Sequence, residues 1–111
     1  MEEICWNDFS KVDMRIGTIL DAEIFVGAKI PAYKLKIDFG DLGIKKSSAQ
    51  ITHRYQPQDL IGKQIVAIVN FPPKQIANFM SECLVLGAVG DEKIVTVLSP
   101  NLLCKNGEHI G

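Results

Sequence analysis

The segment from Tyr33 to Phe39 alternates strictly between apolar and polar side chains. Its odd-numbered positions are aromatic or aliphatic, and Lys34, Lys36 and Asp38 lie between them. Because successive side chains of a β-strand point to opposite faces, a period of two predicts a strand with one buried face. We therefore expect Tyr33 and Phe39 to belong to the core and the two lysines to lie on the outer face.

Strand signals recur along the rest of the chain. The run Ile65–Val69 is continuous and mostly β-branched, which is typical of a strand buried on both sides. A Gly90-Asp91 turn between the last two apolar segments predicts a hairpin. Thr52 as a cap, and Pro73 at a first turn, predict short helical turns around 52–57 and 73–79. The other expected strands cover residues 15–23, 47–52, 83–89 and 94–98.

This order of elements favours an all-β fold in a single domain over residues 1–111. Hydrophobic residues make up 47% of the 111-residue chain and charged residues 23%, a composition that can fill one core. Five or six short strands, with helical turns on either side of the fourth, predict a five-stranded OB-fold Greek-key barrel with N- and C-terminal extensions. An SH3-like barrel is the structural alternative.

The net charge of −1 conceals an uneven distribution. Residues 29–74 contain eight lysines or arginines against three aspartates, whereas the segments on both sides are acidic. Such a basic block can steer an anionic partner, or it can be an ordinary solvated strand face. The acidic start Met1-Glu2-Glu3 and the lack of a long apolar run predict a cytoplasmic protein without membrane insertion.

Short motifs along the chain resemble those of the tRNA-binding domains. Asp8-Phe9 and the segment Val12–Gly17 are similar to the opening motif of these domains. The motifs that follow in register are Tyr55–Pro57, Leu60–Lys63, Val69–Lys74, Ser81-Glu82 and Leu84–Gly87. Domains of this superfamily occur as appendages of methionyl-tRNA synthetases, as free dimers and in cytokine-like synthetase cofactors.

Three segments resemble the CsaA branch of this superfamily in particular. They are Ile30–Leu35, Ser47–Thr52 and Asn70–Pro73, which depart from the corresponding motifs of the nucleic-acid-binding relatives. The resemblance implies a homodimeric, export-related chaperone whose partners are unfolded polypeptides or preproteins. A free-standing protein that binds tRNA or another structured RNA is the alternative.

The expected peptide site centres on the loop at residues 70–82, between the fourth and fifth strands. In OB-folds this loop and the loop between the first two strands border the usual ligand face. The loop is unusually apolar, and aromatic or thioether side chains suit a site that accepts many apolar sequences. Ile76 and Phe79 could instead pack onto the barrel end. The predicted peptide-binding residues are Ser48, Gln50, Asn70, Phe71, Lys74, Ile76, Phe79 and Met80.

The alternative RNA site lies on the basic strand face. Single-strand binders combine a basic groove with exposed stacking aromatics, and only the cations are evident here. Gln75 and Met80 also occupy positions that are often basic in the tRNA-binding relatives. The residues predicted for RNA binding are Lys34, Lys36, Lys45, Lys46, Arg54, Lys74 and Ser81.

Both terminal extensions carry apolar residues that a minimal barrel does not need. Burying them across a twofold axis would form a homodimer, and folding back over the same barrel is the alternative. Arg15 is expected to pair with a carboxylate such as Glu82, and Asn70 to satisfy local backbone groups. The predicted interface residues are Trp6, Phe9, Leu102, Leu103 and Ile110.

The sequence shows no pattern typical of catalysis. It contains no nucleophile elbow and no phosphate-binding glycine loop, and the scattered Cys5, Cys83 and Cys104 have no metal-ligand spacing. His53 follows Ser47 and Ser48 in the sequence, but no carboxylate is identifiable that would orient it. We therefore expect a binding protein that is not an enzyme and uses no metal or cofactor.

Overall fold

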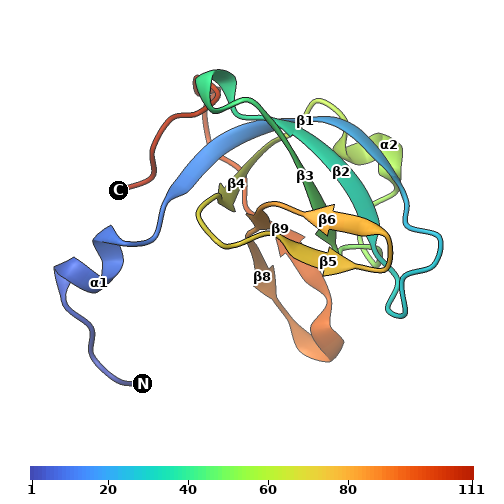
Figure 1. The fold of residues 1–111 in the computed structure, drawn as a ribbon, viewed down its shortest axis with the longest axis horizontal. Coiled ribbons are helices and arrows are strands. Elements are labelled where there is room, and N and C mark those ends of the chain that lie inside the picture. The colour runs from blue at the N-terminus through green and yellow to red at the C-terminus, as the bar shows by residue number, and fades with distance from the viewer.

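The computed structural model describes residues 1–111 as a five-stranded antiparallel sheet that curls into a nearly closed barrel (Figure 1). The strand order is β3-β2-β1-β4-β7, so β3 and β7 are the two edges. This architecture confirms the predicted all-β, OB-fold-like class. The strands are β1 (Met14–Ile24), β2 (Tyr33–Asp38), β3 (Ile44–Ala49), β4 (Gln64–Ile68) and β7 (Leu84–Val85).

Two hairpins and four short helical elements complete the chain. The hairpin β8–β9 confirms the prediction made from the Gly90-Asp91 turn. The hairpins consist of β5 (Lys74–Ile76) with β6 (Phe79–Ser81), and of β8 (Gly87–Val89) with β9 (Val95–Val97). The helices are α1 (Trp6–Ser10) and α2 (Pro57–Leu60), and the 3-10 turns are Gly40–Leu42 and Asp91–Lys93.

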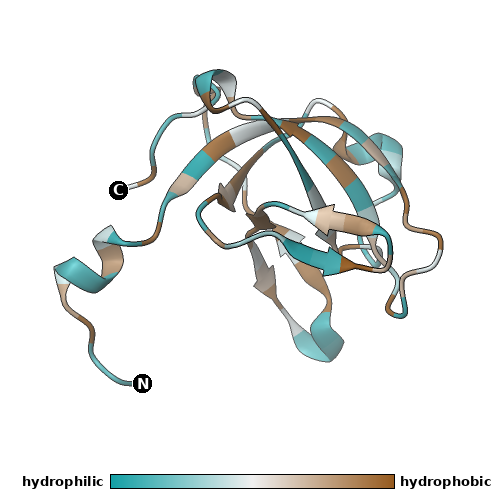
Figure 2. Cartoon of the chain, viewed as in Figure 1, coloured by the Kyte–Doolittle hydropathy of each residue, from teal (hydrophilic) through white to brown (hydrophobic).

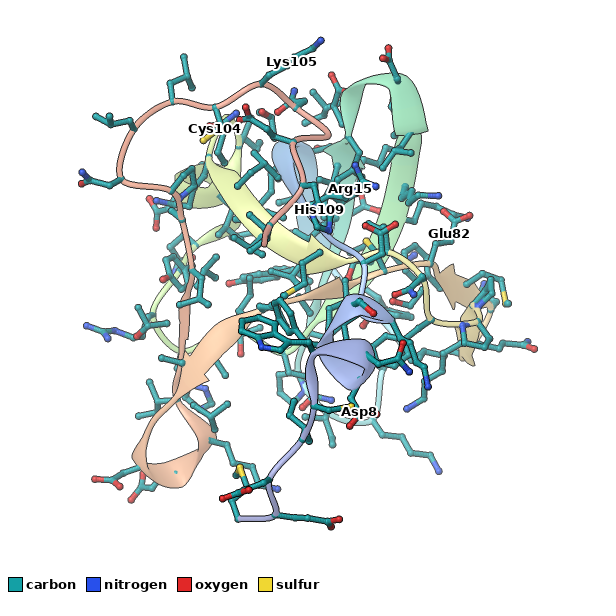
Figure 3. All side chains as sticks on the ribbon, turned by 90° about the vertical axis from the view of Figure 1, so that its left-hand side faces the viewer. Asp8, Arg15, Glu82, Cys104, Lys105 and His109 are labelled. Atoms are coloured by element: carbon teal, nitrogen blue, oxygen red, sulfur yellow. The ribbon has the colours of Figure 1, made fainter.

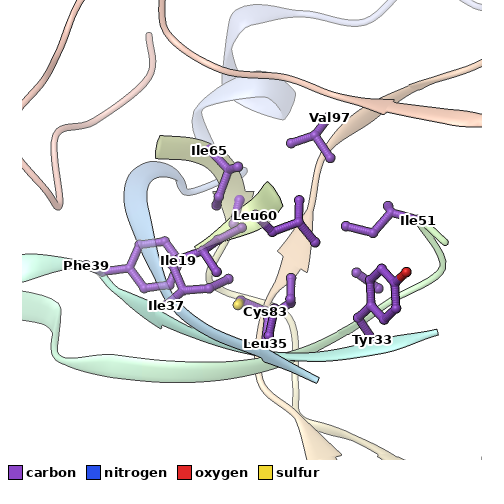
Figure 4. Packing of buried hydrophobic residues seen from close by; sticks show 13 residues of the cluster. Ile19, Tyr33, Leu35, Ile37, Phe39, Ile51, Leu60, Ile65, Cys83 and Val97 are labelled. Atoms are coloured by element: carbon purple, nitrogen blue, oxygen red, sulfur yellow. The ribbon is translucent and has the colours of Figure 1, made fainter. Parts of the chain in front are cut away.

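The core forms from the inward faces of the barrel strands (Figure 4). Tyr33, Leu35, Ile37 and Phe39 are all buried, as their alternation predicts. Figure 2 shows the same alternation as bands of colour along β1 and β2. Leu60 of α2 is completely buried in the main cluster, so this helix closes one end of the barrel.

The long strand β1 bends so that it can pair on both sides. Its first half pairs with β4 and its second half with β2, and the register shifts between Ile19 and Asp21. At Gly17 an added Cβ atom would lie 2.5 Å from Ile37 Cγ2 and 2.7 Å from the Phe39 ring. The chain therefore needs glycine here, because the inner side chains of β2 pack directly against the backbone of β1.

The helical turn predicted at 73–79 is wrong, because this segment is the β5–β6 hairpin. Ile76 pairs with Phe79, and Ala77 between them adopts a positive φ of 53°. A two-residue turn of this kind continues into an antiparallel strand and cannot continue a helix. The prolines before β5 favour extended backbone equally well, and this ambiguity accounts for the error.

Two other boundaries and the burial of one strand differ from the predictions. The expected turn at 52–57 is followed by the helix α2, which begins at Pro57. The third strand begins at Ile44 and ends at Ala49, rather than covering 47–52. The strand β4 is fully buried on only one side, with Ile65 and Ala67 in the core and Val66 and Ile68 half-buried.

The two terminal extensions behave differently. The C-terminal segment returns along β1, where Ile110 N–H donates to the Met14 carbonyl and Gly107 N–H donates to the Ile16 carbonyl. This extension therefore packs on its own barrel. Helix α1 instead stands away from the barrel, as Figure 1 shows. No helix in the structure combines the length and apolar character needed to cross a membrane.

Candidate binding groove

A groove of about 740 Å³ lies in the surface beside the edge of the barrel. Ten of the seventeen residues that line it are hydrophobic. Its walls come from the end of β3 (48–51), the start of the β5–β6 hairpin (71–76), the segment 81–89 and Val95. A groove of this size and composition has the usual properties of a site for an apolar ligand.

The edge of β3 is joined to the segment 81–82 by one backbone bond and by side-chain bonds rather than by a continuous ladder. Glu82 N–H donates to the Lys46 carbonyl at 2.8 Å, and Lys46 N–H donates to Glu82 Oε1 at 2.9 Å. Below them, Ser48 N–H donates to Ser81 Oγ at 3.0 Å. Residues 49–51, which follow Ser48, make no hydrogen bond to the segment 81–87, and they line the groove.

The apolar lining is exposed to an unusual degree. Phe71 is 53% exposed and Leu84 46%, and Val89 is more exposed still. These three side chains come from three different elements and meet at one groove. A contiguous apolar surface of this kind marks a contact site more often than scattered exposed residues do.

Five of the eight residues predicted for peptide binding line this groove. They are Ser48, Gln50, Phe71, Lys74 and Ile76. Met80 is 40% exposed on the β5–β6 hairpin but lies outside the lining. Asn70 satisfies backbone groups, but those of a segment distant in the sequence rather than local ones: it accepts from Asp13 N–H at 3.0 Å and donates to the Lys11 carbonyl at 2.7 Å.

Phe79 belongs to a small second core. It is only 9% exposed and packs edge-on against Phe25, with ring centroids 5.4 Å apart. The ammonium groups of Lys34 and Lys46 lie 5.5 Å and 5.3 Å from its ring centroid, within the range of cation–π attraction. Phe79 therefore anchors the hairpin to the outer face of β2 and β3, as the packing alternative suggested.

The predicted RNA-binding cations are divided among different environments. Lys34, Lys36 and Lys46 occupy outer-face positions of β2 and β3, whereas Lys45 pairs with the buried Ile37 and so shares the inner face. Arg54 donates to Thr96 Oγ1 at 2.6 Å. Lys36 and Lys74 are exposed and form no ion pair, and Ser81 Oγ accepts the Ser48 N–H at the edge of β3.

The expected pair of Arg15 with Glu82 is wrong. Arg15 Nε lies 2.6 Å from Asp13 Oδ1, and its Nη1 donates to the Gly107 carbonyl at 3.1 Å. Figure 3 shows Arg15 beside His109 of the C-terminal segment, with which it forms an isolated β-bridge. The arginine therefore ties the C-terminal extension to β1, and Glu82 binds the edge of β3 instead.

Sequence reasoning missed the far wall of the groove. This wall includes Leu84, Leu86, Val89 and Val95, which the apolar pattern assigns only to strands. Their exposure depends on where the barrel fails to close, and no local sequence pattern predicts this position. No group of three or more histidine, cysteine, aspartate or glutamate side chains has the proximity needed to hold a metal ion.

Sequence comparison identifies the family of this fold and groove. The family model described as "Putative tRNA binding domain" matches residues 14–109, so the chain belongs to the tRNA-binding domain family. A methionine–tRNA ligase of Leptospira interrogans is 34% identical over 108 residues, which are 97% of this chain but 15% of the ligase. A methionine–tRNA ligase of Methanocaldococcus jannaschii is 32% identical over 110 residues, 17% of its length.

Solved structures place the chain near one branch of this family. The chaperone CsaA from Bacillus anthracis str. Ames is 55% identical, with a TM-score of 0.95, and the match covers 99% of this chain and 100% of that one. The CsaA chaperone protein from Picrophilus torridus is 54% identical, with a TM-score of 0.92, and the match covers 98% and 100%. Both similarities support the resemblance that the three sequence segments indicated.

Cys83 at the inner end of the groove should resist alkylation in the folded protein. Burial raises the pKa of its thiol to about 11, from an ordinary value of 9.0, and the thiolate is the reactive form. At about pH 8, iodoacetamide should modify the exposed Cys5 and spare Cys83 until urea unfolds the chain, as peptide mass mapping would show.

The raised pKa of Cys83 also predicts a loss of stability in alkali. The neutral thiol of Cys83 makes its full contribution to the free energy of unfolding below pH 9.0. This contribution is lost as the pH rises to about 11. Its upper bound is about 3 kcal/mol. Urea titrations of a Cys83→Ala variant should lack this component, and an unchanged pH dependence would contradict the assignment.

Proposed function

We propose that this protein is a CsaA-like molecular chaperone that holds unfolded polypeptides, including preproteins destined for export. The exposed apolar groove beside the open barrel edge is the observation that carries the proposal. The similarity to two structures of CsaA chaperones supports the same assignment. Holding a client in such a groove needs no bond cleavage, metal or nucleotide, so the proposed role is that of a binding protein and not of an enzyme. The proposal also places the protein in the cytoplasm, as expected from its sequence.

The groove suits clients that share apolar character but no common sequence. Its polar groups are few, and its apolar walls come from aliphatic and aromatic side chains held on the barrel frame. Burial of apolar surface is non-directional, so it does not require a particular order of side chains in the client. The peptide-binding residues that we propose are Ser48, Gln50, Phe71, Lys74 and Ile76, with Leu84 and Val89 from the opposite wall.

A homodimer is part of the proposal, because apolar side chains near both termini remain uncovered in one subunit. Trp6 is 84% exposed and Leu103 89%, and Leu102 is nearly as accessible. Phe9 packs against Trp6 with ring centroids 6.3 Å apart, so helix α1 carries its own apolar surface away from the barrel. Two subunits would also present two grooves, which raises the avidity for a long client.

Replacing Phe71 tests whether clients bind in the groove rather than elsewhere on the nearby β5–β6 hairpin. Phe71→Ser should weaken the binding of a reduced, carboxymethylated unfolded protein about tenfold, because it removes an apolar wall of the groove. Met80→Ser is the matched control, since Met80 has similar exposure but lies outside the lining, and its effect should stay within about twofold. Isothermal titration calorimetry would measure both, and equal affinities for the two variants would exclude the groove as the client site.

The dimer should dissociate when an apolar terminal residue becomes charged. Leu103→Glu should give a monomeric mass by light scattering at micromolar concentration, whereas Leu42→Glu, at another exposed leucine, should not. Trp6 is the only tryptophan, so its fluorescence should shift to the red on dissociation as the ring becomes hydrated. A monomeric mass for the unaltered protein would overturn the dimer.

Binding of tRNA is the second candidate function, favoured by the family match and by the unpaired cations Lys36 and Lys74. If RNA binds there, its affinity should fall steeply with salt, with a slope of about 0.7–0.9 per neutralised phosphate. The double substitution Lys36→Glu with Lys74→Glu should lower this slope by the contribution of about two phosphates. The control pair Lys93→Glu with Lys105→Glu should leave the slope unchanged. A slope near zero for the unaltered protein would exclude this candidate.

A further inference from the structure

We infer that the client binds as an added β-strand, whose main chain pairs with the free edge of the sheet at Ser48 and Gln50. This inference deepens the proposed chaperone function and rests on it. The occupant is an extended, uncharged, apolar polypeptide segment. Main-chain pairing gives affinity that does not depend on the order of side chains, which is what a holder of many unfolded chains requires.

The first support is that β3 is an edge strand whose outward backbone groups can be assigned. β3 pairs with β2 through Ala49, which lies opposite Tyr33, and nothing follows β3 in the sheet order. The Lys46 carbonyl and Ser48 N–H bond to the segment 81–82, so the even-numbered residues point away from β2. By the alternation of an antiparallel strand the Ser48 carbonyl points to the same side, and we infer that the main chain of Gln50, directly after the strand, continues this outward edge.

The second support is that, along this edge, only the outward backbone groups of Lys46 and the Ser48 N–H have hydrogen-bond partners within the protein. Lys46 and the Ser48 N–H are occupied by Glu82 and Ser81. Gln50 lies beyond the paired residues of β3, is exposed, and makes no hydrogen bond through its main chain or side chain. An unpaired edge beside apolar walls is a template for a further strand, and proteins usually block such an edge.

The third support is that the edge forms a side of the groove. Ser48, Ala49, Gln50 and Ile51 are consecutive lining residues, so a strand added there would run along the groove. Successive side chains of the client would then point to opposite sides, some of them toward Leu84 on the apolar wall. Client binding would thus join main-chain pairing to apolar burial at one place.

Charge decides which extended polymer fits. Lys74 and Glu82 are the only charged residues in the lining, so the groove carries no net charge. A polyanion such as RNA gains little from this groove, because its phosphates would lose their hydration against apolar walls where the one lysine, Lys74, is balanced by Glu82. The structure therefore favours an uncharged peptide segment here, and nucleic acid is an outcome that the test can reveal.

A proline at position 50 tests the role of the main chain directly. Gln50→Pro removes the N–H group, and because this group has no partner within the chain, the ladder of β3 stays intact. Gln50→Ala removes the side chain but keeps the N–H. The probe is a fluorescein-labelled peptide of alternating leucine and serine, and its affinity is measured by fluorescence anisotropy.

We expect Gln50→Pro to weaken binding of this peptide about tenfold beyond any loss caused by Gln50→Ala, because only the proline removes the main-chain N–H as well as the side chain. Far-ultraviolet circular dichroism and urea unfolding would establish that the variants are folded. Should the proline variant not fold, the unaltered protein is titrated with the same peptide carrying esters in place of its central amides. Such a peptide retains its side chains but lacks N–H donors, and we again expect about a tenfold loss.

A further variant distinguishes a wrong binding mode from a wrong function. A Leu84→Ser variant removes apolar wall and leaves the edge of β3 intact. If Leu84→Ser weakens peptide binding while neither the proline nor the ester substitution does, strand addition is wrong and the chaperone groove stands. If Leu84→Ser has no effect, or the peptide does not bind while tRNA does, the proposed function falls together with the inference.

Discussion

The open seam between β3 and β7 is the constraint on which the rest of this structure depends. β7 is two residues long, so it cannot form a full ladder with the opposite edge. Glu82 and Ser81 cover the first backbone groups of that edge, and beyond Ser48 the barrel stays open. Apolar side chains that a closed barrel would hide consequently face solvent. The groove is thus a result of incomplete closure rather than of a separate binding module.

The β5–β6 hairpin separates two surfaces, the basic outer face of β2 and β3 and the apolar groove. Phe79 fixes the hairpin to the outer face of β2 and β3, beneath the ammonium groups of Lys34 and Lys46. Those two cations stack on its ring, while Lys36 remains free. The start of the same hairpin carries Phe71 into the groove. One short element therefore reduces the basic face and builds one apolar wall, which favours polypeptide over nucleic acid at this site.

Several sequence predictions succeeded because they depended on local periodicity. The alternation around Leu35 identified β2 and its buried face, and the Gly90-Asp91 turn identified the hairpin β8–β9. The hairpin at 74–81 was mistaken for a helix because proline before an apolar run is compatible with either element. Arg15 was given the wrong partner because Asp13 and Glu82 are equally plausible carboxylates until the chain is folded.

The sequence by itself determined the fold class, the family and the near wall of the groove. Periodicity and short motifs are properties of neighbouring residues, so they survive without coordinates. Only the tertiary structure decided that Leu84 and Val89 form the far wall, that Phe79 is an anchor, and that the edge strand β3 ends at Ala49, directly before the exposed Gln50. These features depend on which strands meet and where they part. Contacts between residues far apart in the chain fix that geometry, and no local pattern encodes it.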